Sequence, residues 1–365
     1  MPDKQQSLDG RLKQKIRNDG PITIEAFMEA ALTDPDEGYY RQRAPLGVRG
    51  DFVTAPEISQ IFGELIGLWT AEVWREMGAR PAFHLIELGP GRGTLMSDAL
   101  RALTIVPEAI EAAEIHLVEL SARLRAEQQA TLRSAHVSPR WHERLDEVPS
   151  GPSIIIANEF VDALPVRQFV RCSTGWHERC VDVCNEGQFV FTECATPICE
   201  SAEFITRDLG SAELGSIAEL CPGAEPLINE IAARAGTNPT VALIIDYGHL
   251  RHGTGDTLQA VRNHQTADPL KDPGRADLTA HVDFAHLAAC AAGNGLAVYG
   301  PMTQRQFLLS LGLRERLERL VATATPEQVA LLSSGAERLV DPEQMGDLFK
   351  VIAFAGPSGL ELPAF

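Results

Sequence analysis

The sequence predicts an α/β fold in which a mostly parallel sheet carries helices on both faces. Short apolar segments of strand type alternate with amphipathic helical segments over much of the chain, and this alternation is typical of parallel strands joined by crossover helices. A glycine-rich turn also follows the first core strand and leads directly into a helix, which is the setting that a nucleotide-binding glycine loop requires. The sequence adds an N-terminal helical segment and an inserted β-rich subdomain to this core.

Residues 1–80 precede the core and are expected to be mainly helical. Residues 8–32 show helical periodicity with a break at Gly20 and Pro21, two residue types that interrupt helices. A polar and glycine-rich loop follows. A longer helix is predicted over 58–73, where apolar side chains recur on one face.

The core consists of predicted strands separated by helices. Five strands are expected, at about 83–88, 114–119, 139–142, 153–157 and 241–246. After the fifth strand, we expect loops over 249–279 and a helix over 282–293. Two closing strands at 296–299 and 349–354 are separated by helices near 304–310, 312–323 and 326–338.

An insertion separates the fourth strand from the fifth. Residues 166–192 alternate in strand fashion, and the turn at 185–187 suits a hairpin. The sequence therefore predicts an N-terminal helical extension (1–80) that contributes to the ligand pocket, and a core that begins at 81–162. An inserted capping subdomain (163–238) and the remainder of the core (239–365) follow.

The glycine turn is the most informative segment of the chain. Glu87 ends the first core strand, and Gly89, Gly91 and Gly93 follow at alternate positions. Glycines permit positive φ, and without a Cβ they let a ligand lie against the backbone. The dinucleotide fingerprint would need a glycine at position 94, where this chain has Thr. A structural turn without a ligand is the alternative.

A second acid supports an adenosine-type ligand. Glu119 ends the second core strand, and an acid at this point can accept hydrogen bonds from both ribose hydroxyls. NAD enzymes use the same device, so Glu119 does not distinguish between adenosine cofactors. Upstream, Thr54 and Glu57 fit two interpretations, namely a helix-capping box or contact with the bound ligand.

Polar residues at the ends of the fourth and fifth strands mark the expected reaction site. Asn158, Glu159 and Asp162 follow the fourth strand, and ligands of open α/β sheets bind outside the carboxyl ends of the strands. Capping of the next helix is the alternative role. Asp246 and Tyr247 end the fifth strand and are predicted on the acceptor side, where Tyr247 either lines a substrate channel or packs in the core.

Charge and composition exclude several classes of protein. The net charge of −18 opposes nucleic-acid binding, which is built from Lys and Arg. It is compatible with a basic protein or peptide substrate, and equally with simple solubility. No apolar run approaches a membrane span, and the first ten residues lack an apolar signal core. We therefore expect a cytoplasmic protein.

The cysteines and histidines do not indicate a metal site. Five of the seven cysteines fall within 172–199, and none shows the C-x-x-C spacing of a zinc ligand pair. We expect reduced thiols that act as small buried hydrophobic residues. His264, His281 and Asp283 are irregularly separated, so no metal is predicted there.

Taken together, these motifs resemble the MidA-like family of class I S-adenosylmethionine-dependent methyltransferases. The glycine segment 87–96 and the segment 158–165 carry the resemblance together with the segment 50–60, and the remaining matches are at 246–248, 281–284, 303–304 and 345–350. The resemblance implies a Rossmann-like methyltransferase sheet with a family-specific insertion. It also implies S-adenosylmethionine as the cofactor, held by Thr54, Glu57, Glu87, Gly89, Gly91, Gly93, Glu119 and Asn158.

The same resemblance implies an activity. The family includes a mitochondrial complex I assembly factor with protein arginine methyltransferase activity, so the expected substrate is a protein, with a respiratory complex I subunit as one candidate. For an arginine acceptor, a carboxylate must hold the guanidinium by paired hydrogen bonds, and Glu159 is the first candidate, with Asp162 the second. Better-known arginine methyltransferases pair two glutamates instead. An assembly chaperone without turnover and a small-molecule methyltransferase are the alternatives.

Overall fold

The computed structural model describes residues 6–42, 54–135, 137–197 and 203–365, and the chain divides into two compact units. The accessory unit comprises Met1–Phe52, Asp162–Glu225 and Arg251–Asp283. The core unit comprises Val53–Val161, Pro226–Leu250 and Phe284–Phe365. Each unit therefore combines separate stretches of the chain, whereas the boundaries predicted from the sequence follow chain order.

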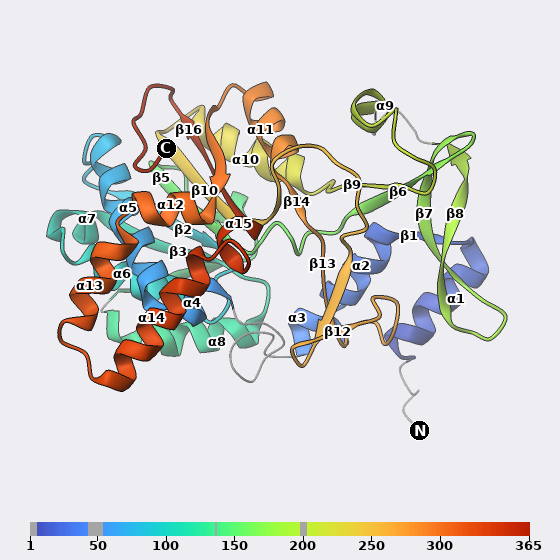
Figure 1. The fold of residues 1–365 in the computed structure, drawn as a ribbon, viewed down its shortest axis with the longest axis horizontal. Helices are drawn as coiled ribbons and strands as arrows, with labels where there is room; N and C mark the ends of the chain where they lie inside the picture. Colours follow the sequence, from blue (N-terminus) through green and yellow to red (C-terminus); the bar gives the residue numbers. More distant parts are fainter. Residues whose placement is uncertain (1–5, 43–53, 136, 198–202) are drawn as a thin grey trace. The chain divides into compact units, whose positions relative to one another are not determined.

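The core unit is built on a mostly parallel sheet with the strand order β15-β16-β10-β5-β2-β3-β4. Figure 1 labels β16, β10, β5, β2 and β3 of this sheet. Strands β10, β5, β2, β3 and β4 pair in parallel with one another, and β16 runs antiparallel to both of its neighbours. The bounds are β2 (Phe83–Leu88), β3 (Ala113–Val118), β4 (Arg140–His142), β5 (Ser153–Asn158), β10 (Thr240–His249), β15 (Ala297–Thr303) and β16 (Phe349–Gly356). The predicted α/β fold and its closing pair of strands are confirmed.

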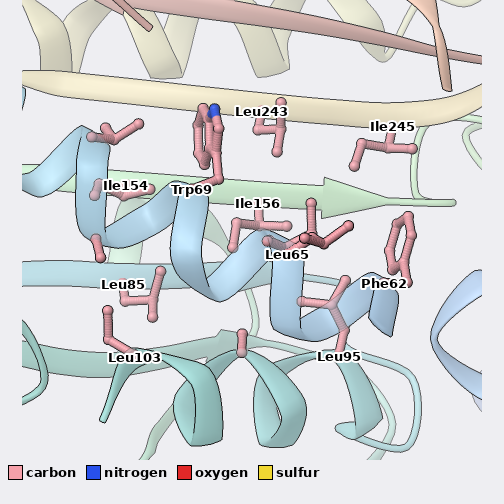
Figure 2. Packing of buried hydrophobic residues seen from close by; sticks show 14 of the residues in the cluster. Phe62, Leu65, Trp69, Leu85, Leu95, Leu103, Ile154, Ile156, Leu243 and Ile245 are labelled. Atoms are coloured by element: carbon pink, nitrogen blue, oxygen red, sulfur yellow. The ribbon is translucent and has the colours of Figure 1, made fainter. Parts of the chain in front are cut away.

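Two helices cover one face of this sheet and create the largest apolar core. Buried side chains of α5 (Gln60–Glu76), including Leu65 and Trp69, pack with residues of β2, β5 and β10, as Figure 2 shows. Against α5 lies α6 (Thr94–Leu103). A Cβ at Gly67 would lie 2.2 Å from the Ala99 carbonyl oxygen, so only glycine allows the two helix backbones this approach.

The remaining core-unit helices lie around the sheet and at its ends. They are α4 (Ala55–Ile58), α7 (Pro107–Ala112), α8 (Ala122–Thr131), α10 (Ala224–Ala235), α11 (Phe284–Gly293), α12 (Gln304–Ser310), α13 (Leu313–Val321), α14 (Pro326–Val340) and α15 (Met345–Leu348), with short 3-10 turns at Leu132–Ala135 and Leu145–Glu147. Capping boxes at Thr303 and Thr325 start α12 and α14, which explains why their first residues were predictable. Within the described part of the chain, no helix is long and apolar enough to cross a membrane.

The accessory unit carries the predicted insertion together with the N-terminal helices. Its larger sheet has the order β1-β7-β6-β9, with β8 paired to β7. The predicted turn closes the β7–β8 hairpin, where Gly187 has φ of 77° and donates a hydrogen bond to the Cys184 carbonyl. The elements are α1 (Leu8–Asp19), β1 (Ile22–Thr23), α2 (Ile24–Thr33), α3 (Tyr39–Gln42), β6 (Arg167–Cys172), β7 (Gly175–Val183), β8 (Phe189–Pro197), α9 (Glu203–Asp208) and β9 (Ile217–Leu220).

Residues 249–279 differ from the expected loops. They contribute a small sheet of β11 (Gln259–Arg262), β12 (Gln265–Ala267) and β13 (Asp277–Thr279), which precedes β14 (Val282–Asp283). These strands are at most four residues long. Such segments are too short for period-two alternation to stand out in a sequence.

The expectation of reduced thiols is wrong for one pair. Cys180 and Cys194 form a disulfide with a Cα–Cα distance of 6.2 Å. The antiparallel β7–β8 pairing brings them together, since Cys180 lies opposite Thr192 and the register shifts nearby. Cysteine spacing alone does not reveal that register. Cys199 lies outside the described residues.

Candidate functional site

The glycine turn between β2 and α6 adopts a backbone that side chains disfavour. Gly89, Gly91 and Gly93 have φ of 61°, 53° and 81°, which is the left-handed region that glycine enters without a Cβ penalty. A Cβ at Gly89 would also lie 2.8 Å from Cδ2 of Phe160. The turn therefore presents bare backbone at the carboxyl end of β2, as a loop that binds a ligand closely requires.

Two buried acceptors lie beside this turn. Glu87 is 3% exposed and Asn158 8%, and they end the neighbouring parallel strands β2 and β5. Within the described residues, Glu87 Oε2 and Asn158 Oδ1 have no hydrogen-bond partner. Burial raises the pKa of Glu87 to about 8. Buried polar atoms rarely stay unsatisfied, so these oxygens fit a ligand that brings hydrogen-bond donors, such as the amino-acid end of S-adenosylmethionine.

Glu119 is tied to the glycine turn through a residue that the sequence analysis missed. Gln128 of α8 donates from Nε2 to the Gly91 carbonyl at 2.7 Å and to Glu119 Oε2 at 3.1 Å. The Ser121 N–H donates to Glu119 Oε1 at 2.8 Å. Burial is the main cause that raises the pKa of Glu119. A carboxylate has about four lone-pair sites, so both oxygens can accept further hydrogen bonds. Gln128 has no sequence signal beyond its place in the helix after β3.

The turn at 54–57 is not a capping box. Thr54 is the N-cap residue of α4, but its side chain makes no capping hydrogen bond. Glu57 instead accepts a hydrogen bond from Thr94 Oγ1 at 2.5 Å and lies 3.3 Å from Arg92 Nη1. Glu57 thus fastens α4 to the glycine turn and to the start of α6.

The N-terminus of α4 also meets the turn that follows β5. Glu159 Oε1 accepts hydrogen bonds from the Ala55 N–H at 3.1 Å and from Asn158 Nδ2 at 3.2 Å. Glu159 has φ of 49°, a conformation that costs free energy and is concentrated at functional sites. The structure therefore holds the Glu159 carboxylate in place from two sides.

Asp246 and Tyr247 lie at the end of β10. Asp246 is 0% exposed, and its carboxylate accepts hydrogen bonds from the Val161 N–H at 3.0 Å and the Tyr247 N–H at 2.9 Å. Tyr247 stacks edge-on against Phe349 with ring centroids 5.5 Å apart. Asp246 therefore fixes the turn that carries Glu159.

Lys350 and Asp162 are the last two residues of the site to be described. Lys350 of β16, which the sequence analysis also missed, donates from Nζ to the Gly248 carbonyl at 2.9 Å and so steadies the end of β10. Asp162 belongs to the accessory unit, where its carbonyl accepts a hydrogen bond from the Ala280 N–H at 3.0 Å. Apart from Asp162, the predicted site residues lie in the core unit on α4 and at the carboxyl ends of β2, β3, β5 and β10. Residues 50–53 of the resembling segment lie outside the described residues.

Comparison with known proteins shows the family of the chain. Residues 65–302 match the family model described as "Putative S-adenosyl-L-methionine-dependent methyltransferase". The chain is 40% identical to "Protein arginine methyltransferase NDUFAF7, mitochondrial" of Mus musculus, over 94% of this chain and 83% of that protein. The homologue of Drosophila melanogaster is 39% identical, over 95% and 84%.

A solved structure gives the same result for the fold. A Burkholderia thailandensis protein with bound S-adenosyl-homocysteine superposes with a TM-score of 0.87 at 29% identity, over 98% of this chain and 94% of that one. S-adenosylmethionine is accordingly the cofactor of this chain.

The expected cytoplasmic location is contradicted by the relatives. The mouse and fly proteins are both named mitochondrial. The prediction had depended on the missing apolar core in the first ten residues, and an absence of that kind does not define a location.

Proposed function

The chain belongs to the S-adenosylmethionine-dependent methyltransferase family, and from this premise we propose that it methylates arginine side chains of a protein. The relatives that share about two fifths of its sequence are named protein arginine methyltransferases. A subunit of respiratory complex I is the acceptor that the MidA-like resemblance suggests.

The observation that carries the proposal is the held carboxylate of Glu159. Two N–H groups of the core unit donate to Glu159 Oε1 and hold the carboxylate in place. A carboxylate can accept paired hydrogen bonds from a guanidinium. It can thereby hold the attacking nitrogen in line and offset the positive charge that makes guanidinium a poor nucleophile.

The other residues have binding and positioning roles in this proposal. When bound, S-adenosylmethionine supplies an electrophilic methyl group on its sulfonium. The glycine turn and Glu119 hold the adenosine part, while Glu87, Asn158, the N-cap residue Thr54 and Glu57 of α4 hold the amino-acid part. Methyl transfer is an in-line displacement, so catalysis depends mainly on this positioning.

The acceptor side is proposed from charge and sequence position. Asp162 remains the second candidate for contact with the guanidinium, and Tyr247 is proposed to contact the acceptor at the end of β10. Asp246 positions the turn that carries Glu159, because it accepts a hydrogen bond from the Val161 N–H. The net charge of −18 attracts a basic protein segment.

Glu159→Gln tests the proposal. The amide keeps the size of the side chain but presents donors where the carboxylate presents acceptors. We expect methyl transfer to an arginine-containing protein or peptide to fall at least ~100-fold, on the scale of lost charge stabilisation in active sites. The dissociation constant for S-adenosylhomocysteine should change less than about threefold, since the lost interaction is made to the acceptor.

A matched control uses the same change elsewhere. Glu108 is an exposed glutamate of α7 in the core unit, and Glu108→Gln should leave the rate unchanged. The product is identified by amino-acid analysis for methylarginine. Full turnover by Glu159→Gln, or methylation of an acceptor other than arginine, contradicts the proposal. Cofactor binding without any methyl transfer favours an assembly chaperone instead.

A further inference from the structure

Three histidines form a line across one face of the core sheet, away from the glycine turn. His84, His116 and His142 come from the adjacent strands β2, β3 and β4. His116 lies opposite Ile86, and His142 lies opposite Val118. Side chains alternate between faces along a strand, so this register places all three imidazoles on the same face. Glu87, by contrast, points to the face that α5 covers.

The imidazole nitrogens of neighbouring strands lie close together. His84 Nδ1 is 3.0 Å from His116 Nε2, and His116 Nδ1 is 2.9 Å from His142 Nε2. Two nitrogens bound to one tetrahedral zinc ion lie about 3.3 Å apart, given a Zn–N distance of about 2.0 Å. The first pair therefore needs only a small movement to hold an ion between them.

A carboxylate completes the set of donors. Glu114 Oε2 lies 4.0 Å from His84 Nδ1, and the ligand atoms of His84, Glu114 and His116 all lie within 4.8 Å of one another. The Glu114 side chain is 43% exposed, so it has room to turn towards the two nitrogens. Arg140 Nη1 lies 3.1 Å from the same oxygen and can keep one carboxylate oxygen while the other binds the ion.

The second nitrogen of each ring already has an outer partner. His84 makes a hydrogen bond to the Ser150 backbone, and His116 Nδ1 faces His142 Nε2. Metal-bound histidines almost always donate their other N–H to such a partner, which fixes the ring orientation. Gly151 packs against the outer nitrogen of His84, since a Cβ there would lie 2.6 Å from His84 Nε2.

We propose that His84 Nδ1, His116 Nε2 and a Glu114 oxygen bind one zinc-type divalent cation, with His142 as the outer partner of His116. Two imidazoles and one carboxylate suit zinc and its first-row neighbours better than calcium or magnesium, which prefer oxygen ligands. A fourth position is left for water.

The site has a structural consequence for the cofactor pocket. The His142 carbonyl accepts a hydrogen bond from the Glu119 N–H at 2.9 Å. An ion that joins β2 to β3, and through His116 to β4, therefore steadies the strand that supports the ribose-binding acid. The cation acts as a clamp of the sheet and takes no part in methyl transfer.

The test measures zinc binding by the full chain. Chelator-treated protein is titrated with Zn²⁺ against a chromophoric competitor, and Co²⁺ replaces Zn²⁺ for a visible spectrum of the ligand field. We expect one ion per chain. Glu114→Gln and His84→Gln should each weaken binding at least ~10-fold, on the scale of altered metal-site residues. Glu114→Gln changes a partly exposed side chain, and circular dichroism checks that each variant folds.

A histidine outside this cluster, His286, provides the matched control. His286 Nε2 lies 3.5 Å from Cys290 Sγ on α11, so this pair is a competing place for adventitious zinc. His286→Gln should bind zinc as the unmodified chain does. The proposal is overturned if no stoichiometric ion binds, if Glu114→Gln and His84→Gln bind normally, or if only His286→Gln loses binding.

Discussion

Burial raises the pKa of Glu87 and so makes the stability of the fold depend on pH. Its pKa rises from the ordinary value of 4.5 to about 8 in the folded protein, because burial disfavours the charged form. Between pH 4.5 and about 8, the folded protein therefore keeps a proton on Glu87 that the unfolded chain has released. The contribution of protonated Glu87 to the free energy of unfolding is fully present below pH 4.5 and is lost as the pH rises through 8.

Glu87→Gln isolates this effect, because the amide resembles the protonated acid at every pH. Between pH 5 and 8, the free energy of unfolding of the unmodified protein should fall relative to the variant, by up to about 1.4 kcal/mol per pH unit. Urea unfolding without added cofactor measures the difference. Equal pH slopes for the two proteins would mean that Glu87 is already ionised in the fold.

Gly91 tests the position of the cofactor pocket. Gly91→Val should abolish S-adenosylhomocysteine binding in calorimetry while the fold is retained. A valine disfavours the observed φ of 53°, at about 1–2 kcal/mol for the left-handed conformation, and its side chain fills the space where a ligand approaches the backbone.

Gly187→Val is the matched control for Gly91→Val. Gly187 has φ of 77°, and a Cβ there would meet nothing within 4 Å. The strain is similar, but this hairpin lies in the accessory unit, so cofactor binding should be kept. Normal binding by Gly91→Val would show that the pocket is elsewhere.

At the scale of elements, one buried carboxylate links β10 to the turn after β5. Asp246 accepts from the Val161 and Tyr247 N–H groups. Asp246→Asn replaces one acceptor oxygen by a donor and leaves a buried N–H without its partner, which should lower the free energy of unfolding by about 1–3 kcal/mol. Asp347→Asn, at an exposed position, should change it by less than about 0.5 kcal/mol. Equal stabilities in urea unfolding would remove Asp246 from this structural role.

The elements that were predicted well from the sequence have strong local sequence patterns. Strands β2, β5 and β16 are buried at every position and their sequences are largely apolar, while α12 and α14 begin with capping boxes. The histidine cluster could not be predicted in this way. His84, His116 and His142 are far apart in sequence, and only the strand order and register bring them together.

At the scale of the whole molecule, the division into two units could not be predicted from patterns along the sequence. The accessory unit takes its hydrophobic core from α1, α2 and the insertion strands, with Phe27 and Val181 among the members. The predicted separation of an N-terminal extension from an insertion followed composition along the chain. Which segments share a core depends on contacts that no local pattern records.

The net charge of −18 belongs to the whole molecule as well. Long-range attraction should raise the encounter rate with a basic substrate, and salt should weaken it, since the Debye length is about 10 Å at 0.1 M and about 3 Å at 1 M. We therefore expect the KM for an arginine peptide flanked by lysines to rise severalfold between 0.05 and 0.5 M salt. A peptide with the same arginine and neutral flanks should show little change, and the affinity for S-adenosylhomocysteine should stay nearly constant. If both peptides respond equally to salt, the charge contributes to solubility alone, and recognition of the acceptor depends on contacts at the site.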